Sequence, residues 1–204
     1  MRPLLGLLLA AIVTGCSASA RSGLPFYTGP DFTASWQATP ARALAFDLRA
    51  QNGSALTGDD LGGRIHVASF VYTRCSVICP VLVERLQAVQ SAIASSDDVR
   101  MVSFSVDPDR DTAEALAAYA HDHTIDVRHW LLLTGDRSQI FRLARTFYFA
   151  DDGRLSGSPN DFLHTEKVLL VDAQGRLRGI YDGTLPHDID RLIADAAFLM
   201  SITS

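Results

Sequence analysis

The chain contains few cysteines, no excess of basic residues and, beyond its N-terminus, no long apolar run. Its 204 residues include three cysteines, so no more than one intramolecular disulfide can form. The 18 basic residues are outnumbered by 23 acidic ones, and no basic cluster indicates a nucleic-acid partner. No segment after the N-terminus could cross a bilayer as a helix. With 48% apolar residues, the chain suits one domain with a sizeable core and short appendages.

The N-terminus resembles a bacterial export signal. Arg2 supplies a short positive region, and residues 4–13 form an apolar stretch of signal-peptide length. The tetrapeptide Val13-Thr14-Gly15-Cys16 then resembles the lipobox of bacterial lipoproteins, in which the cysteine is lipidated and becomes the first mature residue. The alternative is an ordinary signal peptide cleaved near Ala18 or Ala20. The lipobox interpretation also accounts for the odd number of cysteines, which is unusual in an exported protein.

The chain is expected to have three parts. Residues 1–15 form the lipoprotein signal peptide, residues 16–42 form a flexible tether rich in Ser, Ala, Gly and Pro, and residues 43–204 form one folded domain. A lipid on Cys16 would anchor the protein in the bacterial cell envelope, facing the periplasm. That compartment is oxidising, so the redox state of the two remaining thiols would have to be managed.

Strand and helix patterns alternate through the domain. Strand patterns cover residues 64–73, 99–106, 129–133, 166–172 and 176–181, and Asn52-Gly53 predicts a hairpin whose first strand covers 44–48. Helical spacing of apolar residues covers 81–94, 112–123, 137–147 and 187–202. This order predicts an α/β protein with a central mixed sheet flanked by helices and an N-terminal β-hairpin. The final β-β-α unit, with cysteines after an early strand, indicates a thioredoxin-like fold.

The most informative segment is FVYTRCSVICP, residues 70–80. Cys75 and Cys79 lie four positions apart at a predicted strand-to-helix turn, where they could close a reversible disulfide or supply two soft ligands to Cu(I). Pro80 fits the first position of the helix, which makes Cys79 the N-cap and predicts that the helix dipole favours a thiolate there. An inert structural disulfide is disfavoured, because closing so short a loop restrains little chain entropy.

Two thiolates leave Cu(I) under-coordinated, so a neutral imidazole is expected as a third ligand. The available histidines are His66, His121, His123, His129, His164 and His187. Spacing alone does not choose among them. His121 and His123 lie at a predicted helix end, where histidine also complements the dipole. His164 precedes the strand predicted at 166–172, and the loop before that strand lies opposite the cysteine turn in a thioredoxin-like sheet. His164 is therefore the best topological candidate.

Residues 70–80 resemble the hallmark segment of the SCO/SenC family, whose members are membrane-attached, thioredoxin-like copper proteins linked to cytochrome c oxidase assembly. The resemblance extends from Phe46 to the end of the chain, in matching order, over residues 46–48, 52–53, 105–112, 130–135 and 161–165. It implies that Cys75, Cys79 and His164 are the three copper ligands. Ser76-Val77-Ile78 departs from the Pro-Asp or similar pair that often follows the first cysteine in the family, so no carboxylate is expected inside this loop.

Residues 107–112 form another marked segment of the family, yet simple structural roles explain its residues. Pro108 would end a strand, and Asp111 would cap the following helix with Glu114 at its third position. We therefore expect the aspartates of this segment to bind nothing.

Two functions are consistent with these features. The first is a metallochaperone that takes copper from a periplasmic donor and delivers it to the binuclear copper site of a cytochrome c oxidase, on its copper-bearing subunit. The second is a thiol-disulfide reductase that keeps cysteines of the oxidase or another copper protein reduced. Thioredoxins carry a cis-proline before the strand that faces their cysteines. Here the nearest upstream proline is Pro159 and His164 occupies that region, which favours copper handling over catalysis. A peroxidase is disfavoured, because Cys79 lies beside Cys75.

Overall fold

The computed structural model describes residues 23–94, 96–150 and 165–203. The elements are β1 (Asp47–Ala50), β2 (Ala55–Thr57), the 3-10 helix η1 (Gly58–Leu61), β3 (Ile65–Val71), α1 (Ile78–Ile93), β4 (Val99–Ser105), α2 (Ala113–Asp122), β5 (Trp130–Thr134), α3 (Arg137–Thr146), β6 (Lys167–Val171), β7 (Leu177–Asp182) and α4 (Pro186–Thr203). Across these described ranges, no helix is both long and apolar enough to span a membrane.

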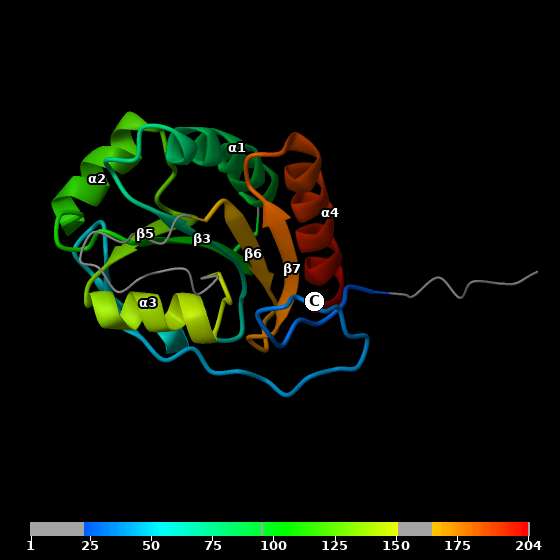
Figure 1. Ribbon diagram of the computed structural model, residues 1–204. Coiled ribbons are helices and arrows are strands. Elements are labelled where there is room, and N and C mark those ends of the chain that lie inside the picture. The colour runs from blue at the N-terminus through cyan, green and yellow to red at the C-terminus, as the bar shows by residue number, and fades with distance from the viewer. Residues whose placement is uncertain (1–22, 95, 151–164, 204) are drawn as a thin grey trace, which may run out of the picture.

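One mixed sheet of seven strands, in the order β2-β1-β5-β4-β3-β6-β7, forms the centre of the domain. Strands β3, β4 and β5 are parallel, whereas β6, β7 and the β1–β2 hairpin are antiparallel to their neighbours. Helices α1, α2 and α4 cover one face, and α3 covers the other (Figure 1). This arrangement confirms the predicted α/β fold with a mixed sheet between helices.

The two faces of the sheet bury separate apolar cores, and β3 contributes to both. Ile65, Val67 and Val71 pack towards α1 and α4, while Ala68 and Phe70 pack towards α3. This alternation follows from the two-residue repeat of a strand. Because all seven residues of β3 are buried, the strand forms a rigid support for the turn that follows it.

Three predicted boundaries differ from the structure. The first hairpin strand begins at Asp47 rather than near residue 44. Helix α1 begins at Ile78, so Pro80 is its third residue and not its first. Proline is tolerated there because the amide groups of the first turn have no intrahelical acceptor. Helix α2 is capped by Thr112, whose side chain accepts a hydrogen bond from the amide of Ala115, and not by Asp111.

Part of the segment predicted as a flexible tether lies against the domain. The Arg178 guanidinium on β7 donates hydrogen bonds to the carbonyls of Leu24 at 2.6 Å and Pro25 at 3.0 Å. The Phe26 ring lies 4.0 Å from the same guanidinium, and the Tyr27 amide bonds the carbonyl of Leu177 at 3.0 Å. Residues 24–27 therefore belong to the folded unit and lie beside the edge strand β7.

The parallel strands place the functional segments at one edge of the sheet. The cysteine turn follows the end of β3, and the segment beginning at Asp107 follows the end of the neighbouring strand β4. Strand β6 runs in the opposite direction, so its start at Lys167, two residues after Thr165, lies at the same edge. Three segments that are distant in sequence therefore meet around Cys75 and Cys79.

Candidate metal centre

The two cysteines lie on either side of the start of α1. Cys75 is in the preceding turn, where its amide donates to the carbonyl of Tyr72 at 3.1 Å. Cys79 is the second residue of the helix and is only 5% exposed. The Cys79 amide donates to the Sγ atom of Cys75 at 3.2 Å. The four-residue spacing therefore brings the pair together, as predicted, and both are free thiols.

The thiol favoured as a thiolate is Cys75 and not Cys79. Burial opposes ionisation of Cys75, but hydrogen bonds from the Cys79 thiol and from the amides of Cys79, Val77 and Ile78 outweigh it and lower the pKa of Cys75. Burial and the hydrogen bond to Cys75 raise the pKa of Cys79 to about 12. The prediction of a Cys79 thiolate was wrong because the helix starts earlier, so the free amides of its first turn surround Cys75 instead.

Tyr72 contacts the cysteine pair, and the sequence analysis did not identify it. Burial and a hydrogen bond between its side chain and Cys75 raise the pKa of Tyr72 to about 12. The hydroxyl therefore stays protonated near neutral pH and can donate a hydrogen bond to the sulfur. The position of Tyr72 three residues before Cys75 was visible in the sequence, but the direction of its side chain was not.

A pocket of about 220 Å³ opens beside the thiols. Its lining residues are Phe70, Tyr72, Arg74, Cys75, Ser76, Val77, Ile78, Cys79 and Thr165. No carboxylate is among these described lining residues, so the pocket offers soft sulfur ligands rather than the oxygen ligands that hard cations prefer. The lining chemistry therefore fits a soft metal such as Cu(I).

His164 and Cys16, the other two predicted site residues, lie outside the described residues. Thr165, directly after His164 in the chain, is buried and lines the pocket. None of the five described histidines lines it. The buried His66, for example, bonds the Tyr148 hydroxyl through Nε2 at 3.1 Å. Within the described ranges, no group of three histidine, cysteine or acidic residues could hold a metal ion.

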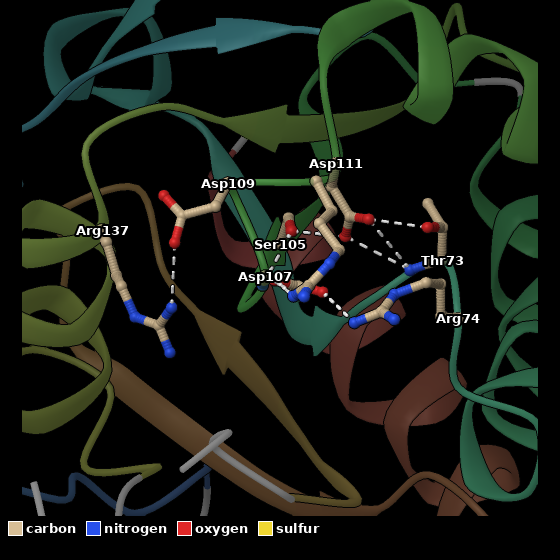
Figure 2. A network of polar contacts seen from close by, with 8 residues as sticks. Thr73, Arg74, Ser105, Asp107, Asp109, Asp111 and Arg137 are labelled. Atoms are coloured by element: carbon tan, nitrogen blue, oxygen red, sulfur yellow. Dashed lines mark hydrogen bonds and ion pairs between the residues drawn. The ribbon is translucent and has the colours of Figure 1, made fainter. Parts of the chain in front are cut away.

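A network of aspartates and arginines lies next to the cysteine turn (Figure 2). Asp107 is 1% exposed and pairs with the guanidinium of Arg74 at 2.9 Å and that of Arg110 at 3.4 Å. Asp111 is fully buried, and its carboxylate accepts hydrogen bonds from the hydroxyls of Thr73 and Ser105, each at 2.6 Å. The prediction that Asp111 caps α2 was wrong, because its oxygens contact the segment before Cys75.

The rim of the pocket is apolar and exposed. Val77 is 75% exposed, and Ile78 and Val81 are about half as exposed, at 39% and 40%. Residues 77, 78 and 81 lie on one side of the first turn of α1, since helical neighbours are three and four positions apart. Arg74, with a side chain 54% exposed, adds a cationic group beside them. The thiols are thus surrounded by a surface suited to contact with another protein.

Comparison with known proteins connects this site to a family. The model of the SCO1/SenC family matches residues 36–201. The SCO1 protein homolog of Bacillus subtilis is 29% identical over 152 residues, which cover 74% of this chain and 78% of that relative.

Solved structures agree with this match. A SCO1/SenC family lipoprotein from Bacillus anthracis gives a TM-score of 0.68 at 28% identity, covering 79% of this chain and 95% of that one. BsSco, a member of the Sco family of cytochrome c oxidase assembly proteins for which a disulfide switch is described, gives 0.68 at 26% identity, covering 81% and 98%. The copper-bound ScoI of Bradyrhizobium japonicum gives 0.62 at 26%, covering 79% and 99%. The family match over most of the chain and the shared thioredoxin-like fold show that this chain belongs to the SCO1/SenC family.

Proposed function

We propose that this protein is a copper metallochaperone that holds one copper ion through Cys75, Cys79 and His164 and delivers it to the copper-bearing subunit of a cytochrome c oxidase. The observation that carries the proposal is the pocket in which both thiols meet Thr165. Thr165 directly follows His164 in the sequence, which supports His164 as the proposed third ligand. The copper-bound relative from Bradyrhizobium japonicum supports the choice of metal.

The chemistry of the pair suits a cargo that must be released. Thiolate and imidazole ligands bind Cu(I) well, and a low-coordinate site leaves room for an incoming ligand from an acceptor. Cys75 is the more accessible and more readily ionised thiol, whereas Cys79 is buried against the core. We infer that Cys75 is the ligand exchanged first when copper passes to the acceptor.

The apolar rim supports delivery to a protein. Handover by ligand exchange requires the acceptor site to approach the thiols directly, so its surface must contact Val77 and its neighbours. Val77 and Ile78 would bury apolar area on docking, and Arg74 would favour an acidic group on the partner. The binuclear copper site of the oxidase is the proposed acceptor, and a periplasmic copper donor is the proposed source.

A thiol-disulfide reductase remains the second candidate, because one observation favours it. An accessible cysteine of lowered pKa beside a buried cysteine of raised pKa is the arrangement expected of an attacking and a resolving thiol. However, the residue directly before Thr165 is His164 and the nearest upstream proline is Pro159, so the sequence carries no proline where thioredoxins have their substrate-docking proline. Copper handling therefore explains more of the site.

We also propose that Cys16 carries a lipid that anchors the protein in the bacterial cell envelope, facing the periplasm. The lipobox-like segment before Cys16 and the similarity to a SCO1/SenC family lipoprotein support this location. Cys16→Ala should leave the protein unprocessed or release it from the membrane fraction, because lipid attachment supplies the hydrophobic anchor. A variant that is processed normally and stays in the membrane would contradict the lipid anchor.

The decisive experiment for the function compares three variants. Cys75→Ser and Cys79→Ser should each abolish tight binding of one copper per chain in the reduced protein, measured by competition with a Cu(I) chelator. His164→Ala should weaken copper binding while Cys75 and Cys79 still cycle between dithiol and disulfide. Cells carrying His164→Ala should lose oxidase activity at low copper and regain part of it when copper is added. Normal oxidase assembly by His164→Ala at low copper would instead favour the reductase.

A further inference from the structure

We propose that Asp111 is a positioning residue for the cysteine pair, and that its contact with Thr73 fixes the turn that carries Cys75. The proposal concerns the placement of the two sulfurs. The effect that we predict on copper affinity rests on the proposed function, whereas the effect that we predict on the Cys75–Cys79 disulfide equilibrium does not.

The contact between Asp111 and Thr73 is dense and buried (Figure 2). The Thr73 hydroxyl donates to Oδ1 of Asp111 at 2.6 Å, and the Thr73 amide donates to Oδ2 at 3.2 Å. The Ser105 hydroxyl at the end of β4 donates to Oδ2 at 2.6 Å. One carboxylate thus joins the end of β3 to the end of β4 on the side where the cysteine turn begins.

Two long-range polar contacts reach this turn: the half-exposed side chain of Arg74 pairs with Asp107, and Thr73 bonds the buried Asp111. Residues 72–77 between β3 and α1 form no helix or strand, and the amide of Cys75 bonds Tyr72 within the same turn. Thr73, two residues before Cys75, is held by Asp111 from 38 positions away. Ordering a loop backbone is entropically costly, and binding groups must be held to within about half an ångström. A fixed anchor at Thr73 therefore limits the positions open to Cys75.

Asp111 differs from its neighbour Asp107 in a way that favours this role. Asp107 pairs with two arginine side chains that are largely exposed. The described residues give Asp111 no ion pair, and the carboxylate is fully buried with hydroxyl and amide donors only. Burying a carboxylate without a cation costs free energy, because the group loses hydration without gaining a salt bridge. A contact that only joined two strands would not require this cost. Since Thr112 already caps α2, the cap does not explain Asp111 either.

Four variants test the role of this contact. Thr73→Val removes the hydroxyl but keeps the shape of the side chain, and Thr73→Ser keeps the hydroxyl. Asp111→Asn replaces one carboxylate oxygen by an amide NH₂ group, which cannot accept a hydrogen bond from Thr73. Asp172→Asn is the control for general destabilisation: Asp172 is also buried and hydrogen-bonded, it pairs with Arg176 and Arg178, and it follows β6 at the opposite end of the sheet.

Two measurements report on the positions of the sulfurs. The first is the equilibrium between the Cys75–Cys79 disulfide and a reference dithiol in metal-free protein. Disulfides have strict geometry, and their formation depends on the effective concentration of one thiol near the other. We expect Thr73→Val and Asp111→Asn to make the disulfide at least threefold less favourable. The second is copper affinity with the absorption spectrum of the Cu(II)-thiolate complex. We expect about tenfold weaker binding and a shifted band, as for other groups that orient ligands.

The outcomes separate this proposal from the proposed function. Wild-type levels of both readouts in Thr73→Val would overturn the positioning role, and so would equal changes in Asp172→Asn. Full retention of both readouts in Thr73→Ser supports the role of the hydroxyl. If the wild-type protein bound no copper, the metallochaperone would be wrong, yet the disulfide equilibrium would still test Asp111. If Asp111→Asn does not fold, Thr73→Val decides the question.

Discussion

Cys75 and Cys79 are chemically unequal, although both belong to one short motif. The free amides at the start of α1 surround Cys75, while Cys79 turns into the core beneath it. At neutral pH an alkylating reagent should therefore modify Cys75 in the folded protein well before Cys79. Mass spectrometry after a brief pulse of iodoacetamide would measure this order, with urea-unfolded protein as the control in which the rates converge. Faster modification of Cys79 would show that the helix amides stabilise the thiolate of Cys79 rather than that of Cys75.

His66 should make the fold sensitive to acid. Burial lowers its pKa from the ordinary value of 6.5 to about 4, so below pH 6.5 the unfolded chain binds the proton more readily than the folded one. Stability is fully present above pH 6.5 and falls as the pH drops towards 4, by about 3 kcal/mol at pH 4 for this group alone. Urea denaturation at pH 7 and pH 4.5 should show that the free energy of unfolding decreases less for His66→Gln than for the wild-type protein. Equal decreases in the two proteins would show that a group other than His66 causes the acid sensitivity.

The sequence predicted the two thiols but not what surrounds them. The motif identified Cys75 and Cys79 because both lie within five consecutive residues. Asp111 contacts Thr73 across 38 positions and Asp107 contacts Arg74 across 33. Local spacing carries no information about such contacts, so a simple capping role was assigned to Asp111.

At the scale of elements, the two helices next to the site begin in different ways. Helix α1 has Val77 at its N-cap with no side-chain cap, which leaves its first amides free for the sulfur of Cys75. Helix α2 has Thr112, which accepts from the Ala115 amide at 3.2 Å. The order of strands and helices was predictable from periodicity. The exact start of α1 was not, since proline is compatible with several positions of a first turn.

Thr112→Ala should destabilise the protein by about 1 kcal/mol, because it removes the N-cap of α2. Thr112→Ser retains the hydroxyl and should be close to the wild-type protein. Chemical denaturation gives both free energies of unfolding. Copper affinity should be unchanged in both, since Thr112 does not line the pocket. A loss of copper affinity in Thr112→Ala would mean that the α2 cap, and not only Asp111, positions the site.

At the scale of the molecule, the folded unit begins earlier than the sequence indicated. Residues 16–42 are rich in small residues and proline, which is typical of a linker. Yet Phe26 and Tyr27 contact β7, and the carbonyls of Leu24 and Pro25 accept bonds from Arg178. A few aromatic residues within a polar segment were enough to anchor it, and average composition does not reveal such contacts.

A chain beginning at Trp36 should therefore be less stable than one beginning at Gly23. It would leave Arg178 without its carbonyl partners and without the Phe26 ring, a loss of about 2 kcal/mol or more in the free energy of unfolding. Arg178→Lys in the longer chain should account for part of the difference. Equal unfolding midpoints for the two chains would show that residues 23–35 contribute nothing to the fold.

The docked N-terminal segment also limits how far the copper pocket could lie from a membrane anchor. Tyr27 joins β7 at Leu177, at the end of the sheet opposite the cysteine turn. With a lipid on Cys16, Leu24 would lie eight positions after the anchor, a reach of no more than about 28 Å. The seven residues of β3 add about 23 Å before the turn. The thiols could then meet only an acceptor that lies within this combined distance of the lipid anchor.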